Sequence, residues 1–400
     1  MLWLAHAKSL AAQEPRTLLG HTGPVQAVAF SPDGELLASC SNGPPARVML
    51  WSTTTGELVS RLSTGVDNYC QSVHQLAFRG GGKKLVGCSN SYRRCGGGGS
   101  VAVWDIPTFR GRLSVYFPGR PSYIFAVSGD CNTIAMGTEA DWDDGIPART
   151  LEPAREPPQP PQVPPPFRSQ RPVLLPSHPP RVPSEHRKDL KSFDSIDKNG
   201  PIAAWSFHHN LILWDLAAER VRAGAKFPNV FALALSPDGK TLAAGQRNRV
   251  VLLDASSLQP LDTIDALGLV AVMSFSHDGR MLATVPQSPD DPKSTGKSVS
   301  LWDISTGGLT MTFQTQAGPI RALAFSPRGR ILATAGGVPD VSEIKLWDVE
   351  SGELLTEFKG HDGPACCVAF SPDGRTLAWG GDGWTVRLWD LGYGLPQPGD

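Results

Sequence analysis

The sequence predicts an all-β protein made of seven repeats, each folding as a sheet of four antiparallel strands. Two observations lead to this fold class. One phrase recurs along the 400 residues: an apolar strand ending in Ala-Phe, the turn Ser-Pro-Asp-Gly, an apolar strand beginning with Leu-Ala, and another ending in Leu-Trp-Asp. In addition, 42 glycines and 36 prolines supply many turns, and a chain rich in turns favours many short strands.

Turn tetrads and dipeptides of the Trp-Asp type alternate one-to-one along the chain. Five of the six intervals between tetrads lie between 40 and 50 residues, and the remaining interval of 108 contains a long insertion. Five of the seven dipeptides are intact Trp-Asp. Regular spacing of this kind indicates a repeat architecture. The tetrads begin at Ser31, Arg79, Ser128, Ser236, Ser276, Ser326 and Ser371, and the dipeptides at Trp51, Trp104, Trp214, Leu253, Trp302, Trp347 and Trp389.

The tetrads have the chemistry of a hairpin turn between the first and second strands of a repeat, although two of them are degraded, to Arg-Gly-Gly-Gly over 79–82 and to Ser-Gly-Asp-Cys over 128–131. Proline fixes φ at the first corner, aspartate accepts backbone hydrogen bonds, and glycine supplies a positive φ. On the strand before the first tetrad, Ala27 and Ala29 share one face, while Val28 and Phe30 share the other. Strands that are apolar on both faces are expected where sheets pack face to face. We therefore predict a seven-bladed β-propeller.

The ring of blades is expected to close through the N-terminal strand. Residues 391–396, after the last Trp-Asp, make a poor strand, so the last blade would lack its outer strand. Residues 16–19 align with residues 354–358 of the preceding repeat, and we predict that they complete the C-terminal blade. The expected organisation is an N-terminal extension over 1–15, the propeller over 16–391 and a C-terminal tail over 392–400.

The third repeat contains a long insertion, residues 139–209, with a proline-rich core over 147–183. This core holds 14 prolines in 37 residues, so polyproline II or disorder is expected there. Residues 155–161 fit the basic-x-x-Pro-x-x-Pro pattern of Src-homology-three ligands. An insertion without a selected function is the alternative.

The repeats resemble those of the WD-repeat (WD40) β-propeller family. The repeat length, the Trp-Asp ending, and the Gly-His pairs at Gly20-His21 and Gly360-His361 match that family. Because only these two pairs are present, the family's Asp–His–Ser/Thr–Trp hydrogen-bond tetrad is expected to be incomplete in most blades. The resemblance implies structural roles for Trp51, Trp104, Trp214, Trp302, Trp347, Trp389, Asp105, Asp215, Asp254, Asp303, Asp348, Asp390, His21 and His361.

Length variation is concentrated in the connection between the second and third strands of each repeat. These connections all lie on one face of a propeller, together with the connections between repeats. Insertions of this kind commonly map to a binding face, which is the hypothesis we adopt; neutral drift of loop length is the alternative. The long connections cover residues 43–47, 89–100, 139–209, 286–297 and 336–342.

Six residues on connections between second and third strands are candidates for partner binding, five on the long connections and Trp384 on the short connection of the seventh repeat. Tyrosine, arginine and tryptophan are typical interface anchors, although a merely solvated loop is an open alternative. Residues 141–144 contain three acids on one short loop, which is more typical of a solvated segment than of a metal site. No metal or cofactor is therefore predicted. The candidates are Tyr92, Arg93, Arg94, Asp141, Trp142 and Trp384.

Charge and cysteine usage narrow the function further. The net charge is −1, without the basic surplus of a nucleic-acid binder, and no apolar run approaches the roughly 20 residues of a membrane span. The seven cysteines form no Cys-x-x-Cys pair, which indicates free thiols in a reducing compartment and predicts a cytoplasmic protein without nucleic-acid or membrane partners.

The sequence predicts a non-enzymatic protein–protein interaction scaffold that presents a loop-rich propeller face to a protein or peptide partner. It is expected to be a monomer or part of a larger complex. One alternative is a propeller-based enzyme of the hydrolase type; the sequence lacks a nucleophile elbow and a phosphate-binding loop, which argues against it. The other alternative is one module of a larger signalling protein.

Overall fold

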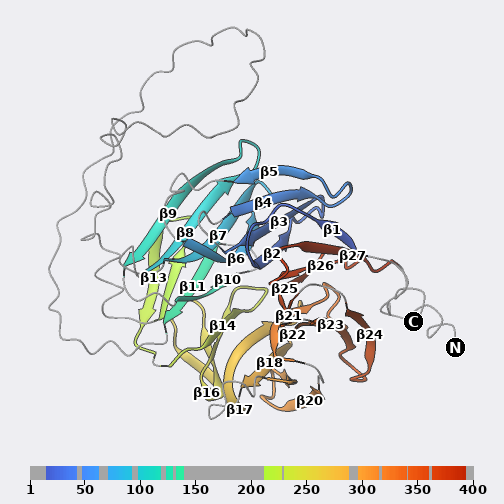
Figure 1. The fold of residues 1–400 in the computed structure, drawn as a ribbon. Coiled ribbons are helices and arrows are strands. Elements are labelled where there is room, and N and C mark those ends of the chain that lie inside the picture. The colour runs from blue at the N-terminus through green and yellow to red at the C-terminus, as the bar shows by residue number, and fades with distance from the viewer. Residues whose placement is uncertain are drawn as a thin grey trace, which may run out of the picture.

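The computed structural model describes residues 15–42, 47–62, 71–91, 98–118, 123–128, 132–138, 211–227, 229–287, 296–314, 318–339, 341–359 and 363–392. These residues form strands and turns, and none of them is helical, so the predicted all-β fold is confirmed (Figure 1). No helix that is long and apolar enough to span a membrane occurs among them. The insertion over 139–209 and the C-terminal residues from 393 onward lie outside the described residues.

Five antiparallel sheets have four strands each, and one has seven. Three of the four-stranded sheets lie within residues 25–225. The first contains β2 (Val25–Phe30), β3 (Leu36–Ser41), β4 (Arg47–Ser52) and β5 (Leu58–Leu62); the second contains β6 (Gln71–Arg79), β7 (Lys84–Ser91), β8 (Gly98–Asp105) and β9 (Arg110–Pro118); the third contains β10 (Tyr123–Val127), β11 (Thr133–Thr138), β12 (Leu211–Asp215) and β13 (Arg220–Ala225).

The remaining sheets follow in chain order. The seven-stranded sheet contains β14 (Ala232–Leu235), β15 (Thr241–Gly245), β16 (Arg247–Asp254), β17 (Pro260–Phe275), β18 (Met281–Gln287), β19 (Ser298–Asp303) and β20 (Leu309–Gln314). The last two sheets contain β21 (Ile320–Phe325), β22 (Ile331–Val338), β23 (Val341–Asp348) and β24 (Leu354–Lys359), then β25 (Ala365–Phe370), β26 (Thr376–Gly381) and β27 (Val386–Asp390), with β1 (Arg16–Leu18) as the fourth strand.

The long strand β17 joins two repeats that the sequence separates. Its first half pairs with β16, and its second half pairs with β18 from Leu269 onward; Leu269 is opposite both Arg247 of β16 and Gln287 of β18. Residues 261–267 contain neither proline nor glycine, so no residue there ends the strand. Within this strand Gly268 has a left-handed φ of 89°. The fourth and fifth repeats therefore share one continuous strand instead of being linked by a loop.

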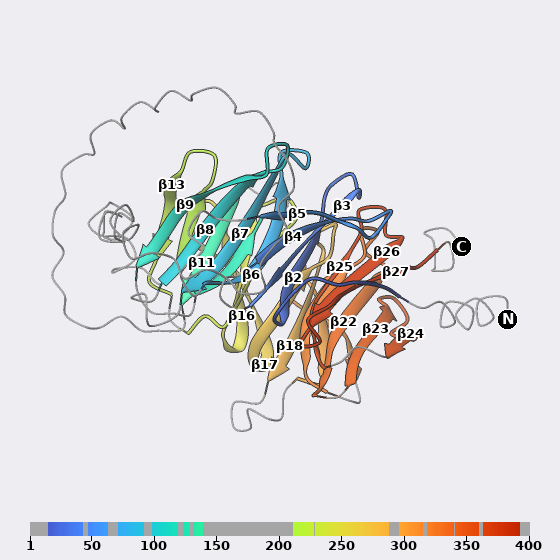
Figure 2. The same cartoon turned by 45° about the horizontal axis from the view of Figure 1, so that its top comes forward.

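The first strands of the sheets lie beside one another around a common centre (Figure 1). β2 lies beside β6 and also beside β25, so the first and last sheets are neighbours, as the side view shows (Figure 2). β1 pairs with β27, where Arg16 is opposite Leu388 and Leu18 is opposite Val386. The last sheet thus consists of β25, β26 and β27 together with β1, which comes from the N-terminal part of the chain.

Apolar side chains fill the spaces between neighbouring sheets. Between the last and first sheets, Leu18, Val28 and Trp51 pack with Cys367 and Leu388. Similar clusters join each pair of successive repeats. Dense packing over both faces of each sheet makes the framework rigid, because interiors packed to crystal-like density leave little freedom for movement.

The turn tetrads form hairpins as predicted, and they contact one another across the sheets. In the first tetrad the Gly34 N–H donates to the Ser31 carbonyl at 2.9 Å, and Gly34 has φ 76°. A Cβ on Gly34 would lie 3.8 Å from Cδ of Pro372, in the last tetrad. The face that carries these tetrads and the turns between third and fourth strands is called the turn face below. The opposite face carries the turns between second and third strands and is called the loop face.

Candidate partner-binding face

Trp384 is the sequence-predicted candidate that lies within the described residues. Tyr92, Arg93, Arg94, Asp141 and Trp142 lie outside them. Among the described residues, the loop face includes the turns that follow β15, β22 and β26 and the strand starts that lie beside them.

Trp384 occupies an unusual position in the tight turn between β26 and β27. Its N–H donates to the Gly381 carbonyl at 3.2 Å, its φ is 61°, and 52% of its surface is exposed. A bulky residue in the left-handed region is destabilised by about 1–2 kcal/mol relative to an ordinary backbone conformation. The side chain also leaves a large apolar area in water. Strain of this kind is concentrated at ligand-binding and catalytic sites, so the turn is a candidate binding element.

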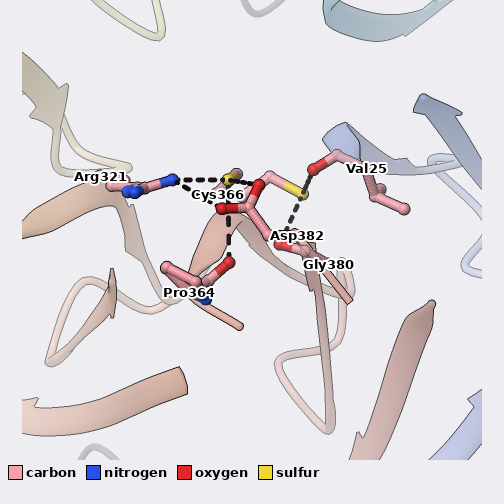
Figure 3. A network of polar contacts seen from close by, with 7 residues as sticks. Val25, Arg321, Pro364, Cys366, Gly380 and Asp382 are labelled. Atoms are coloured by element: carbon pink, nitrogen blue, oxygen red, sulfur yellow. Dashed lines mark hydrogen bonds and ion pairs between the residues drawn. The ribbon is translucent and has the colours of Figure 1, made fainter. Parts of the chain in front are cut away.

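A polar network connects the last two sheets next to this turn (Figure 3). Nη1 of Arg321, at the start of β21, donates to Oδ2 of Asp382 at 3.3 Å and lies 3.3 Å from Sγ of Cys366 on β25. The Asp382 N–H donates to the Pro364 carbonyl at 3.1 Å, which fixes the turn to the start of β25. The side chains of Arg321 and Asp382 are each 40% exposed, so this ion pair is open to a partner.

The cysteines near this network are thiols rather than reactive thiolates. Burial raises the pKa of Cys366, and this effect exceeds the opposing effect of the Arg321 guanidinium. Burial also raises the pKa of Cys367, and that of Cys40 to about 12. Because the thiolate is the nucleophile, protonated thiols indicate a structural or binding role for these residues.

The hairpin between β22 and β23 adds an apolar surface to the same region. The sequence predicts a loop over residues 336–342, but the strands continue to the tip, where Val338 pairs with Val341. The reason is that valine favours extended backbone. Val338 and Val341 are 38% and 40% exposed. A Cβ on Gly363 would lie 3.0 Å from Cβ of Asp382 and 3.5 Å from the Pro339 carbonyl, so the hairpin and the Trp384 turn meet at Gly363.

A second turn of the loop face, between β15 and β16, carries positive charge. Gln246 accepts a hydrogen bond from Nε of Arg249 at 2.7 Å, and its N–H donates to the Arg249 carbonyl at 2.9 Å. Arg247 and Arg249 are both exposed. This connection is short in the sequence. Its length alone does not indicate that the two arginine side chains are exposed.

The residues with family-implied structural roles lie inside the sheets or in turns. The six tryptophans are buried. In the first repeat, Ser39 links His21 and Trp51, at 2.6 Å from Nε2 of the histidine and 2.7 Å from Nε1 of the tryptophan. His361 lies outside the described residues. The aspartates that follow the tryptophans, together with Asp254, accept backbone hydrogen bonds from the turn that follows: Asp105, Asp215, Asp254, Asp303, Asp348 and Asp390.

A central cavity of about 540 Å³ lies among the first strands. Most of the residues that line it are apolar in type, including Leu235, Phe275, Phe325 and Phe370, but polar atoms contribute at least as much of the lining surface as apolar atoms do. The described residues that line it include one histidine, His277, and no acid. In the described ranges, no group of three or more His, Cys, Asp or Glu side chains is arranged to hold a metal ion.

Comparison with known proteins identifies the repeat. The family model described as "WD domain, G-beta repeat" matches residues 12–43, 307–348 and 352–390. The chain is 31% identical over 155 residues to the WD repeat-containing protein SL1-17 of Schistosoma mansoni, a match that covers 38% of this chain and 48% of that protein. It is 36% identical over 90 residues to the small ribosomal subunit protein RACK1y of Oryza sativa subsp. japonica, a match that covers 22% of each.

These matches establish that the chain carries WD40 repeats. The chain spans less than half the length of either of these relatives. The matched segments include the repeats that carry Arg321, Val338 and Trp384. The loop face of the last two sheets is thus part of recognisable WD40 repeats.

Proposed function

We propose that this WD40-repeat chain is a non-catalytic scaffold that binds a protein or peptide partner on its loop face. The observation that carries the proposal is Trp384, which is half exposed and held at φ 61° in a turn where glycine would be unstrained. Binding accounts for both features, because tryptophan is enriched among the residues that dominate interface energies.

The surroundings of Trp384 support the same conclusion. The exposed ion pair of Arg321 with Asp382 and the exposed valines of the β22–β23 hairpin lie next to its turn. Interfaces of this type combine an apolar anchor with polar groups at its edge. The rigid sheets hold these side chains in place, so little conformational entropy is lost on binding.

The relatives agree with a scaffold role in general terms. They are described as a WD repeat-containing protein and as a small ribosomal subunit protein. Thiols whose pKa values are raised by burial support the non-catalytic part of the proposal. We further propose a cytoplasmic location, supported by the free cysteines Cys40, Cys366 and Cys367 and tested by cell fractionation.

Recovery of partners on immobilised protein tests the proposed function. Wild type is compared with Trp384→Gly on the loop face and with Phe109→Gly on the turn face, where Phe109 is also an exposed aromatic residue, with φ 55°. We expect the first variant to lose the recovered partners and the second to keep them. A third variant lacking residues 145–200 separates the insertion from the loop face. Equal recovery by the two glycine variants would contradict the proposal.

A further inference from the structure

We propose that Arg321, Asp382, Trp384 and the tip of the β22–β23 hairpin form one anchor site, which takes a peptide segment carrying an acidic side chain close to an apolar one. This inference rests on the proposed function and adds the chemistry of the partner. It follows from the unused hydrogen-bonding capacity of Arg321, from the exposure of Trp384 and the valines, and from the contact of their turns.

The open charge in this site is positive. Both of the polar contacts of the Arg321 side chain use Nη1, and in the described part of the chain Nε and Nη2 have no partner. The other guanidinium nitrogens lie on the side away from Asp382 (Figure 3). Both Asp382 oxygens are already engaged, Oδ2 by Arg321 and Oδ1 by the Cys366 thiol at 3.7 Å. A carboxylate therefore fits the free edge of Arg321, which presents paired N–H donors in a plane.

The apolar half of the site lies next to this charge. Trp384 is two residues after Asp382, which places their backbones within about 7 Å. Val338 and Val341 belong to the hairpin that meets the same turn at Gly363. A partner in extended conformation advances about 3.3 Å per residue. Its acidic and apolar side chains are therefore expected within about three residues of each other in sequence.

A peptide fits this site better than a nucleic acid. One guanidinium can contact one phosphate, but nucleic acids are bound by extended basic surfaces that neutralise many phosphates. Here the guanidinium is already paired with Asp382, whose carboxylate repels the further phosphates that a nucleic acid would bring beside the one bound to Arg321. The apolar surface beside it also offers no favourable contact to a phosphate backbone.

Binding of the full chain to an array of short peptides tests the inference. The peptides contain a glutamate and a leucine or phenylalanine at spacings of one to three residues, and each has a partner peptide with glutamine in place of glutamate. We expect wild type to bind the glutamate peptides with about ten-fold or greater affinity than the glutamine peptides. A hydrogen bond to a charged group accounts for a difference of this size. Equal binding of the glutamate and glutamine peptides overturns the inference, as does a failure of every peptide to bind.

Four variants locate the preference. Arg321→Gln is expected to abolish discrimination between glutamate and glutamine peptides. Asp382→Asn removes the competing charge at nearly constant shape, so it should strengthen binding of glutamate peptides several-fold. Trp384→Gly should weaken all peptides about ten-fold or more without lowering Tm, because glycine relieves the positive φ. Phe109→Gly makes the same backbone change on the turn face and should leave binding unchanged.

The outcomes separate this inference from the proposed function. If wild type recovers a protein partner through Trp384 but binds glutamate and glutamine peptides equally, the scaffold function holds and the proposed recognition of an acidic side chain is wrong. If Trp384→Gly and Phe109→Gly bind every partner equally, the loop face itself is wrong. If Arg321→Gln lowers Tm, its weaker binding could come from unfolding. Asp382→Asn is the control, because its expected effect is stronger binding, which unfolding cannot produce.

Discussion

At the scale of single residues, the left-handed positions in the turns between third and fourth strands are the clearest case of sequence and backbone in conflict. Glycine occupies this position at Gly56, Gly307 and Gly352, with φ between 65° and 77°. Phe109 and Glu219 occupy it in the second and third repeats, with φ 55° and 50°. The same conformation is ordinary for glycine and strained for the other residues.

We therefore predict that Phe109→Gly stabilises the protein. Relief of the left-handed strain exceeds the greater chain entropy of glycine in the unfolded state, for a net gain of about 0.5–1 kcal/mol in the free energy of unfolding. The midpoint of urea unfolding measures it. Gly307→Ala is the reverse change at an equivalent position and should lose stability. A lower midpoint for Phe109→Gly would show that the aromatic ring itself stabilises the turn.

Asp254 should make stability depend on pH. The hydroxyl and N–H groups of Ser256 and Ser257 donate to Oδ1 of this carboxylate and hold its pKa well below the ordinary value. Because the folded pKa is depressed, the stabilisation is fully present above about pH 5 and is lost as pH falls below about 4. Asp254→Ala should thus lower Tm at pH 7, and its difference from wild type should shrink at pH 3. A difference that stays constant with pH excludes the charge as the cause.

The candidate site was only partly predictable at this scale. Trp384 is recognisable because an aromatic residue stands in a short polar turn. Arg321, Cys366 and Asp382 were missed, because they come from three segments that touch only when neighbouring sheets pack side by side. No spacing along the sequence indicates that these segments are in contact. Predicting the contact requires knowing first which sheets are neighbours.

At the scale of strands and turns, the sequence predicted most of the architecture. The tetrads form hairpins because proline, aspartate and glycine each satisfy one requirement of the turn. The prediction was wrong where strands outlast their expected ends, in β17 and in the β22–β23 hairpin. Residues 261–267 of β17 contain neither proline nor glycine, and the β22–β23 hairpin turns only at Pro339, so pairing with a neighbouring strand decides where each ladder stops.

Gly268 is the residue that allows β17 to serve two repeats. Its φ is 89°, and a Cβ would lie 2.6 Å from the Gln287 carbonyl oxygen, which is a backbone atom and cannot move away easily. We expect Gly268→Ala to lower the free energy of unfolding by about 2–3 kcal/mol. Gly329→Ala is the control, because Gly329 has φ 75° and no atom within 4 Å of its Cβ position. Equal losses in both variants, measured by urea unfolding, would mean that the close approach is unimportant.

At the scale of the whole molecule, the account depends on the ring being closed by the N-terminal strand. Leu18 and Leu19 provide a matched pair for this claim, since Leu18 is 1% exposed between the last and first sheets and Leu19 is 72% exposed. Leu18→Ala should destabilise the protein by about 2–4 kcal/mol, while Leu19→Ala should change stability by less than about 0.5 kcal/mol. Thermal unfolding of the two variants compares them. A Leu18→Ala variant as stable as wild type would show that β1 does not hold the ring together.

Hydrogen exchange of the full chain with a captured partner tests the central claim, that the loop face is the binding surface. The account predicts slower amide exchange in the partner complex at residues 337–342 and 382–385. It predicts unchanged exchange on the turn face at residues 107–109 and 305–307. Protection confined to the turn face, with none at residues 382–385, would contradict the account.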